Sequence, residues 1–232
     1  MARRYVKIPF MRMHRKSHLD ERLLSCGDYL TVADLKDKNM KRAAAEREEL
    51  DFLKLFKNAN PVRLEIGCGK GKFVCELAAR QPEINFIAVE KISNVLIEAV
   101  ERAKAEKLKN VHFINSAAEV LPRYIKEGSI DKIYLNFSNP LPKLGYAKQR
   151  LTHPRFLDMY KAFLKDGGEI VQKTDDGDFY RFSLESYKEC GFKIVETCEN
   201  LTALADPENI VTEHEKRFSD MGKNIYRIIA EK

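Results

Sequence analysis

The amino-acid sequence predicts a doubly wound α/β domain with a mainly parallel sheet, on two observations. From residue 62 onward, short apolar runs alternate with amphipathic segments of helical length, which is the pattern of successive βαβ units. A glycine-rich turn at residues 67–71 follows the first apolar run directly and leads into a helical pattern. We therefore divide the chain into a basic N-terminal arm and helix, residues 1–58, and one domain, residues 59–232.

Seven runs have the length and composition of strands, so a seven-stranded sheet is expected. In chain order they are Val62–Ile66, Asn85–Val89, Val111–Asn115, Lys132–Phe137, Glu169–Gln172, Phe192–Thr197 and Ile225–Ala230. Before them, the residues from Leu35 to about Lys57 are rich in good helix formers and contain neither proline nor glycine. That stretch predicts one helix, which ends at the Asn-Ala-Asn-Pro sequence of residues 58–61.

Positive charge is concentrated at the N-terminus. The chain has a formal net charge of +6, and residues 1–22 contain seven basic residues against two acidic ones, whereas residues 23–58 are balanced. A basic arm suits a polyanion because each phosphate that it neutralises releases condensed counterions. A solvated tail accounts for the same charges, and the charges alone leave both interpretations open.

Composition excludes several classes of protein. No apolar run approaches the roughly 18–20 residues that span a bilayer, and the apolar stretch at residues 8–11 is too short for a signal peptide. A cytoplasmic protein without membrane contact is therefore expected. The five cysteines form no C-x-x-C pair, so we expect reduced thiols and no metal site.

The glycine turn is the most specific signal in the sequence. A dinucleotide fingerprint and a phosphate-binding P-loop would each require a glycine at the position of Lys72. The remaining pattern is E-x-G-x-G-x-G, formed by Glu65, Gly67, Gly69 and Gly71, and it resembles the first motif of class I methyltransferases. An acid is favourable beside the sulfonium and ammonium groups of S-adenosylmethionine, and it is repulsive beside a pyrophosphate.

Two later residues extend the expected donor site. Glu90 ends the second strand, where a carboxylate can accept hydrogen bonds from both ribose hydroxyls, although a bound NAD would call for the same residue. Ser116 follows the third strand, where this class of enzyme usually has an acid or an amide for the adenine amine. The predicted S-adenosylmethionine contacts therefore include Glu65, Gly67, Gly69, Glu90 and Ser116.

Four motifs further along the chain carry a closer resemblance. They are N-F-S-N-P-L-P-K at residues 136–143, Y-A-K-Q-R-L-T at 146–152, K-T-D at 173–175 and T-E-H-E-K-R-F at 212–218. They resemble N-F-x-D-P-W-P-K, H-x-K-R-R-L-T, K-T-D and T-x-x-E-x-K-F of the tRNA (guanine-N7)-methyltransferase family, often called TrmB. The resemblance covers about residues 60–232. It implies a Rossmann-like class I methyltransferase fold and methyl transfer from S-adenosylmethionine to N7 of a guanine in the variable loop of tRNA.

The same resemblance assigns the acceptor site. It implies that Asn139 and Asp175 are catalytic and that Asn139 also contacts the donor. The implied substrate contacts are Lys143, Asp175, Thr212 and Glu215. The sequence departs from the family pattern at four positions, which hold Asn139 for aspartate, Leu141 for tryptophan, Tyr146 for histidine and Gln149 for arginine.

The departure at Asn139 is compatible with the chemistry. Guanine N7 presents a lone pair, so no base has to remove a proton before attack. An amide can therefore orient the reactants, while Asp175 or Glu215 supplies negative charge near the developing cation. Simpler roles are also open, because Asp175 can belong to a turn, Thr212 and Glu215 fit a capping box, and the basic residues near Lys143 can form a solvated face.

Two alternative functions are open from the sequence. Asn139-Pro140 resembles the N-P-P-aromatic motif of exocyclic-amine methyltransferases, but Leu141 and Pro142 offer no aromatic ring. A tRNA-binding paralogue with weak or lost turnover would keep the donor pocket and would have lost activity at Asn139. The sequence is compatible with a monomer and with a homodimer.

Overall fold

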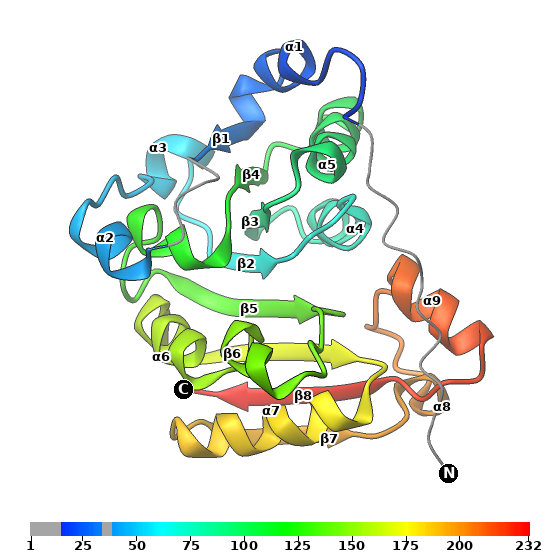
Figure 1. The fold of residues 1–232 in the computed structure, drawn as a ribbon. Helices are drawn as coiled ribbons and strands as arrows, with labels where there is room; N and C mark the ends of the chain where they lie inside the picture. Colours follow the sequence, from blue (N-terminus) through cyan, green and yellow to red (C-terminus); the bar gives the residue numbers. More distant parts are fainter. Residues whose placement is uncertain (1–14, 34–38) are drawn as a thin grey trace.

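The computed structural model describes residues 15–33 and 39–232, and it has the expected α/β architecture (Figure 1). The sheet has eight strands in the order β1-β4-β3-β2-β5-β6-β8-β7. β8 is antiparallel to its neighbours β6 and β7, and the other neighbouring pairs are parallel. The strands are β1 (Leu30–Val32), β2 (Val62–Ile66), β3 (Asn85–Glu90), β4 (Val111–Asn115), β5 (Ile130–Asn136), β6 (Leu164–Thr174), β7 (Lys193–Cys198) and β8 (Tyr226–Glu231).

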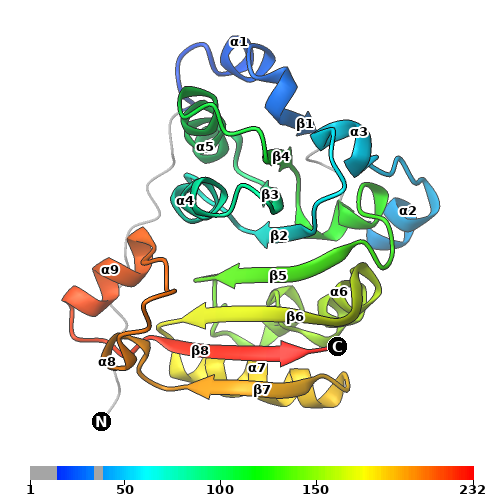
Figure 2. The same ribbon diagram turned by 180° about the vertical axis from the view of Figure 1, so that it is seen from behind.

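Helices cover both faces of the sheet, and a separate cluster of buried apolar side chains lies on each face (Figure 1, Figure 2). One cluster holds side chains of α1 (Leu19–Leu24), α4 (Lys72–Arg80) and α5 (Ser93–Ala105). The other holds side chains of α2 (Met40–Ala45), α3 (Phe52–Phe56), the 3-10 helix η2 (Ala118–Arg123), α6 (Pro154–Phe163) and α7 (Gly177–Glu189). The remaining elements are η1 (Gly27–Tyr29), η3 (Leu144–Gln149), α8 (Leu201–Leu204) and α9 (Glu213–Asp220).

The predicted fold class is confirmed, and all seven predicted strands are present. The largest difference in their bounds is at β6, predicted as Glu169–Gln172 and observed as Leu164–Thr174. The expected count of seven is wrong by one, because β1 adds an eighth strand beside β4. A strand of three residues gives no recognisable alternation, and its attachment depends on a distant partner, since the Thr31 hydroxyl lies 2.9 Å from Nε2 of His112.

The single helix predicted from Leu35 to about Lys57 is wrong. Residues 35–38 lie outside the described residues, and the rest of the stretch forms two short helices, α2 and α3, with extended backbone between them. There the Glu48 and Leu50 N–H groups donate to the carbonyls of Arg123 and Tyr124, at 2.7 and 2.9 Å. Pairing with a distant segment therefore overrides the helix propensity of this stretch.

Three further observations concern the expected absences and the cysteines. No helix among the described residues is long and apolar enough to cross a membrane. Within the same residues, no group of three or more His, Cys, Asp or Glu side chains is arranged to hold a metal ion. All five cysteines are free.

Candidate active site

The predicted site residues gather at one edge of the sheet, where β4, β3, β2, β5 and β6 have their carboxyl ends. Figure 1 shows α9 beyond the arrowheads of β5 and β6 at this edge. The order of the strands reverses between β2, which leads to β3 on one side, and β5 on the other. In doubly wound sheets this switch point opens a crevice that binds ligands.

The glycine turn after β2 has the conformation that a close ligand requires. Gly67, Gly69 and Gly71 all have positive φ values, of 87°, 57° and 74°. Apart from each glycine and its two chain neighbours, no described atom lies within 4 Å of the position where a Cβ of Gly67 or Gly69 would be, so the backbone there is open to a ligand. A Cβ on Gly71 would lie only 2.5 Å from Cβ of Ala99, so this glycine allows α4 and α5 to pack closely.

Glu65 precedes the turn and is buried, with 3% of its surface exposed. Its Oε1 accepts a hydrogen bond of 3.0 Å from Nδ2 of Asn136, and its Oε2 has no partner among the described residues. Burial raises the pKa of the Glu65 carboxyl to about 7, and the neighbouring charge of Glu90 raises it further, against the lowering effects of Asn136 and Lys173. A buried acid with an unused oxygen fits the ammonium group of S-adenosylmethionine.

Glu90 and Ser116 occupy the ends of β3 and β4. The Glu90 carboxylate accepts from the Gly69 N–H at 3.3 Å and from the Ile92 N–H at 2.9 Å, so it ties the glycine turn to the start of α5. Ser116 is buried, and its hydroxyl donates to the carbonyl of Ala117 at 2.9 Å, which leaves its oxygen able to accept a hydrogen bond. Both residues therefore lie where a nucleoside would meet the sheet.

The loop after β5 carries Asn139, whose side chain is exposed. Its Oδ1 accepts from the Leu141 N–H at 3.1 Å and forms a local turn. Phe137 and Leu141 have left-handed backbones, with φ values of 51° and 44°, which costs about 1–2 kcal/mol for a residue with a Cβ. Arg150 holds this conformation, because its guanidinium donates to the Leu141 carbonyl at 3.1 Å and lies 4.3 Å above the ring of Phe182.

Asp175, at the end of β6, is half-buried and already has a partner. Its carboxylate forms an ion pair with Lys223, whose ammonium nitrogen lies 4.4 Å from the centre of the Phe218 ring. Asp175 thus lies at the predicted edge of the sheet, but its negative charge is paired with Lys223, a residue that the sequence motifs did not indicate.

The capping-box interpretation of α9 is confirmed for Thr212 alone, because the Glu215 side chain bonds to Lys173 and Asn209 and does not turn back to the start of the helix. Thr212 caps the helix, and its Oγ1 accepts from the Glu215 N–H at 3.0 Å. The Glu215 carboxylate is buried and forms an ion pair of 2.8 Å with Nζ of Lys173, with both side chains only 4% exposed. On the same helix His214 stacks against Phe137 and Phe218 packs against it at a tilt, with ring centres 6.0 Å apart in each case. α9 is therefore fastened to the end of β6 and to the loop after β5.

The comparisons with known proteins agree with this geometry. The family model "Putative methyltransferase" matches residues 59–228. A tRNA (guanine-N(7)-)-methyltransferase of Alkaliphilus oremlandii is 45% identical over 175 residues, which cover 75% of this chain and 83% of that protein. The chain belongs to the tRNA (guanine-N7)-methyltransferase family. A second member, from Oceanobacillus iheyensis, is 36% identical over 217 residues, which cover 94% of this chain and 97% of that protein.

A solved structure supports the fold of this methyltransferase independently. The crystal structure of the 16S rRNA methyltransferase KamB matches with a TM-score of 0.61 at 16% identity, over 80% of this chain and 94% of that one. At this identity, the likeness concerns the architecture alone.

Four residues that organise this edge of the sheet were not indicated by the sequence. Asn136 orients Glu65, Lys173 holds α9 through Glu215, Arg150 holds the loop after β5, and Lys223 pairs with Asp175. Burial lowers the pKa of the Lys173 ammonium, and the nearby Glu215 charge opposes this effect. Asn136 and Lys173 lie within recognised motifs, but only the folded chain shows which atoms they contact.

The described part of the methyltransferase's N-terminal arm is docked on α5. Lys16 forms an ion pair with Glu98, and Arg22 pairs with Glu101 at 2.7 Å. The four most N-terminal basic residues, Arg3, Arg4, Lys7 and Arg12, lie outside the described residues. The described basic residues of the arm, Arg15, Lys16 and Arg22, are already paired with carboxylates. The four N-terminal basic residues are therefore the main candidates for phosphate contacts.

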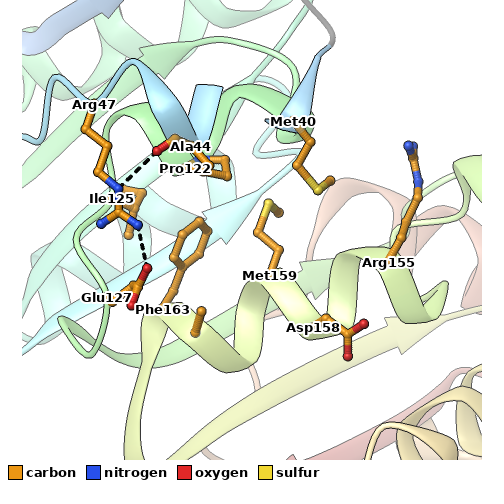
Figure 3. A pocket seen from close by; sticks show the side chains of 11 residues that line it. Met40, Ala44, Arg47, Pro122, Ile125, Glu127, Arg155, Asp158, Met159 and Phe163 are labelled. Atoms are coloured by element: carbon orange, nitrogen blue, oxygen red, sulfur yellow. Dashed lines mark hydrogen bonds and ion pairs between the residues drawn. The ribbon is translucent and has the colours of Figure 1, made fainter. Parts of the chain in front are cut away.

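A cavity of about 320 Å³ lies away from the methyltransferase's predicted site. It is bordered by α2, η2 and α6, with Met40, Met159 and Phe163 pointing toward one another and Arg47 donating to Glu127 (Figure 3). Its lining includes residues that directly precede β5 and β6, so it lies at their amino ends, whereas Asn139 and Asp175 follow the carboxyl ends. The cavity is therefore separate from the donor and acceptor residues.

Proposed function

We propose that this protein transfers a methyl group from S-adenosylmethionine to N7 of a guanine in tRNA, and that the guanine lies in the variable loop. Family membership supports the reaction and the substrate class. One observation supports this edge of the sheet as the site: the buried carboxyl of Glu65, with an unpartnered oxygen, lies beside a glycine turn that is open to a ligand. A tRNA substrate supports a cytoplasmic location.

The donor site follows the order of the strands. We assign the ammonium group to Glu65, the ribose hydroxyls to Glu90 and the adenine amine to Ser116, at the ends of β2, β3 and β4. The turn at Gly67 and Gly69 lets the backbone approach the donor closely. S-adenosylmethionine, when bound, supplies an electrophilic methyl group, and no metal is required for its transfer.

The acceptor site has to position a nucleophile that is already competent. The N7 lone pair of guanine forms the new bond without loss of a proton, so the protein's task is alignment and stabilisation of the charge that grows on the base. We propose that Asn139 orients the reactants and that Asp175, once released from Lys223, faces the developing cation. Thr212 and Glu215 then act on the substrate by fixing the position of α9.

The tRNA itself needs a wider surface. Lys143 is exposed beside η3, which presents Leu144 and Tyr146 with 88% and 48% of their surfaces exposed. We propose that Lys143 contacts a phosphate and that Tyr146 stacks on a base.

The experiment that tests the function uses purified protein, labelled S-adenosylmethionine and an unmodified tRNA transcript. Digestion to nucleosides should yield labelled 7-methylguanosine, and replacing the variable-loop guanine by adenine should abolish the label. Glu65→Ala serves as the inactive control. Label in a methylated exocyclic amine would instead support the rival enzyme class.

A tRNA-binding protein with weak or lost turnover is the second candidate. Two observations favour it: Asn139 replaces the family's aspartate, and the Asp175 carboxylate is paired with Lys223. Tight tRNA binding without 7-methylguanosine on any transcript would support this function over the first.

Donor binding should not depend on a metal. In calorimetric titration, S-adenosylmethionine is expected to bind equally well with and without a chelator, because the site offers protein donors and acceptors throughout. Glu65→Ala should weaken binding by about tenfold or more, since it removes a charge-assisted contact. Tight binding of NAD in place of S-adenosylmethionine would contradict the assignment.

Truncation of the arm should change only the binding of tRNA. Deleting residues 1–14 removes four basic residues and leaves the Lys16 and Arg22 ion pairs in place. The slope of log K against log salt is expected to flatten by about 0.7–0.9 for each lost phosphate contact, while donor affinity stays constant. Changing the same four residues to glutamine is the matched control. An unchanged slope in both variants would show that residues 1–14 do not contact the phosphates of tRNA.

A further inference from the structure

Three buried polar atoms lack a partner near the ends of β2 and β5. They are Oε2 of Glu65, Oδ1 of Asn136 and Oγ of Ser138, and none of them has a hydrogen-bond partner among the described residues. β2 and β5 are paired in register up to Glu65 and Tyr134, Asn136 is the last residue of β5, and Ser138 follows in the loop after the left-handed Phe137. An unsatisfied buried polar atom costs about 1–3 kcal/mol, so native proteins rarely leave several together.

All three atoms can accept a hydrogen bond, and neither the Asn136 amide oxygen nor an ionised Glu65 carboxylate oxygen can donate one. The Asn136 amide nitrogen donates to Oε1 of Glu65 at 3.0 Å, which fixes the rotation of both groups. Each of the two side chains then has one free acceptor oxygen left. The set therefore calls for a donor with several N–H groups.

The protein's own nearby cation cannot serve as that donor. Lys173 is close enough to influence the charge of Glu65, but its three N–H groups have other acceptors. Nζ of Lys173 donates to Oδ1 of Asn209 at 2.9 Å, to the carbonyl of Ile210 at 3.0 Å and to Oε2 of Glu215 at 2.8 Å. The missing donor is therefore not among the described residues, and a bound ligand can supply it.

We propose that Asn136 and Ser138, together with Glu65, form a three-acceptor site for the primary ammonium group at the amino-acid end of the methyl donor. An ammonium group has three N–H donors and no acceptor, which matches three acceptor oxygens. The order of the strands supports the placement, because Glu90 on β3 and Ser116 after β4 lie on the nucleoside side of β2, and β5 lies on the other. Asn136 is thus a specificity residue that selects donors with an intact amino-acid end. The inference rests on the proposed donor site.

A pair of ligands that differ only in that end tests the proposal. S-adenosylhomocysteine carries the amino-acid group, and 5′-methylthioadenosine has the same nucleoside and a thioether sulfur without it. In calorimetric titration of the full chain, Asn136→Ala is expected to weaken S-adenosylhomocysteine by about 10- to 100-fold, the scale of a charge-assisted hydrogen bond. Its affinity for 5′-methylthioadenosine should change by less than about twofold.

Asn85→Ala is the matched control. Asn85 is also buried, donates through Nδ2 to Oδ1 of Asn58 and to the carbonyl of Asn60, and leaves its Oδ1 unpartnered, but it starts β3 at the opposite edge of the sheet. It should affect neither ligand. Ser138→Ala, which keeps the Asn136–Glu65 contact, provides a second variant if Asn136→Ala does not fold, and it should weaken S-adenosylhomocysteine alone.

The possible results separate this proposal from the donor site on which it rests. An equal loss for both ligands, or no loss of S-adenosylhomocysteine in either variant, would overturn the role of Asn136 and Ser138. Failure of the wild-type protein to bind either ligand would overturn the donor site itself.

Discussion

Replacing Asn139 with alanine is expected to slow single-turnover methyl transfer to tRNA by about 30- to 700-fold. This range corresponds to about 2–4 kcal/mol, the usual contribution of one preorganised polar contact to transition-state stabilisation. Asn139→Asp should keep or raise the rate, because a carboxylate still accepts from the Leu141 N–H and adds negative charge near the developing cation. A quenched-flow assay with pre-bound labelled donor measures both variants.

The same assay should separate a catalytic Asp175 from a merely structural one. Asp175→Asn and Lys223→Gln both remove the ion pair between these residues, but only the first removes the carboxylate. The rate should therefore fall strongly in Asp175→Asn and hold or rise in Lys223→Gln, with donor affinity unchanged in both. An equal fall in the two variants would assign Asp175 a structural role. If neither Asp175→Asn nor Asn139→Ala changes the rate, the acceptor pocket lies elsewhere.

Changing Glu65 to glutamine should stabilise the ligand-free protein while it weakens donor binding. Burial raises the pKa of the Glu65 carboxyl in the folded chain to about 7 from its ordinary value of 4.5. Between these two pH values the unfolded chain loses the proton and the folded chain keeps it, so wild-type stability falls as the pH rises. At 1.36 kcal/mol for each pH unit, Glu65→Gln should gain about 3 kcal/mol at pH 8 and almost nothing at pH 4.5.

Denaturant unfolding at several pH values tests this expectation, with donor titration alongside. The other groups that influence the carboxyl, chiefly Glu90 and Lys173, are present in both proteins, so the difference between the two curves reports on Glu65. Parallel curves from pH 4.5 to pH 8 would contradict the buried, unpaired state of this acid. Saturating S-adenosylmethionine should raise the free energy of unfolding of wild type by more than that of Glu65→Gln, because wild type binds the donor more tightly.

Local patterns predicted the strands and the conformation of the glycine turn well, because both depend on neighbouring residues. Apolar runs in β2 to β5 mark buried strands, and the spacing of Glu65, Gly67 and Gly69 is a property of one short segment. The class of fold and the edge that carries the site follow from these signals.

The residues that fix the acceptor side could not be predicted in the same way. The partners Arg150 and Leu141 are nine residues apart, and Lys223 and Asp175 are 48 apart, so their contacts exist only once the chain is folded. The broken helix between α2 and α3 has the same cause, because the backbone of Glu48 pairs with that of Arg123. Helix propensity and motif spacing contain no information on such partners.

The buried ion pair between Lys173 and Glu215 determines with which relatives this chain can exchange segments. The two residues belong to different segments, one at the end of β6 and one in α9, and each is the other's only charged partner within hydrogen-bonding distance among the described residues. Both belong to the K-T-D and T-x-x-E-x-K-F patterns, so a crossover between them with a relative that carries both patterns still supplies one lysine and one glutamate. A parent that lacks one of the two would instead leave an uncompensated charge in the interior, at a cost of about 3–5 kcal/mol.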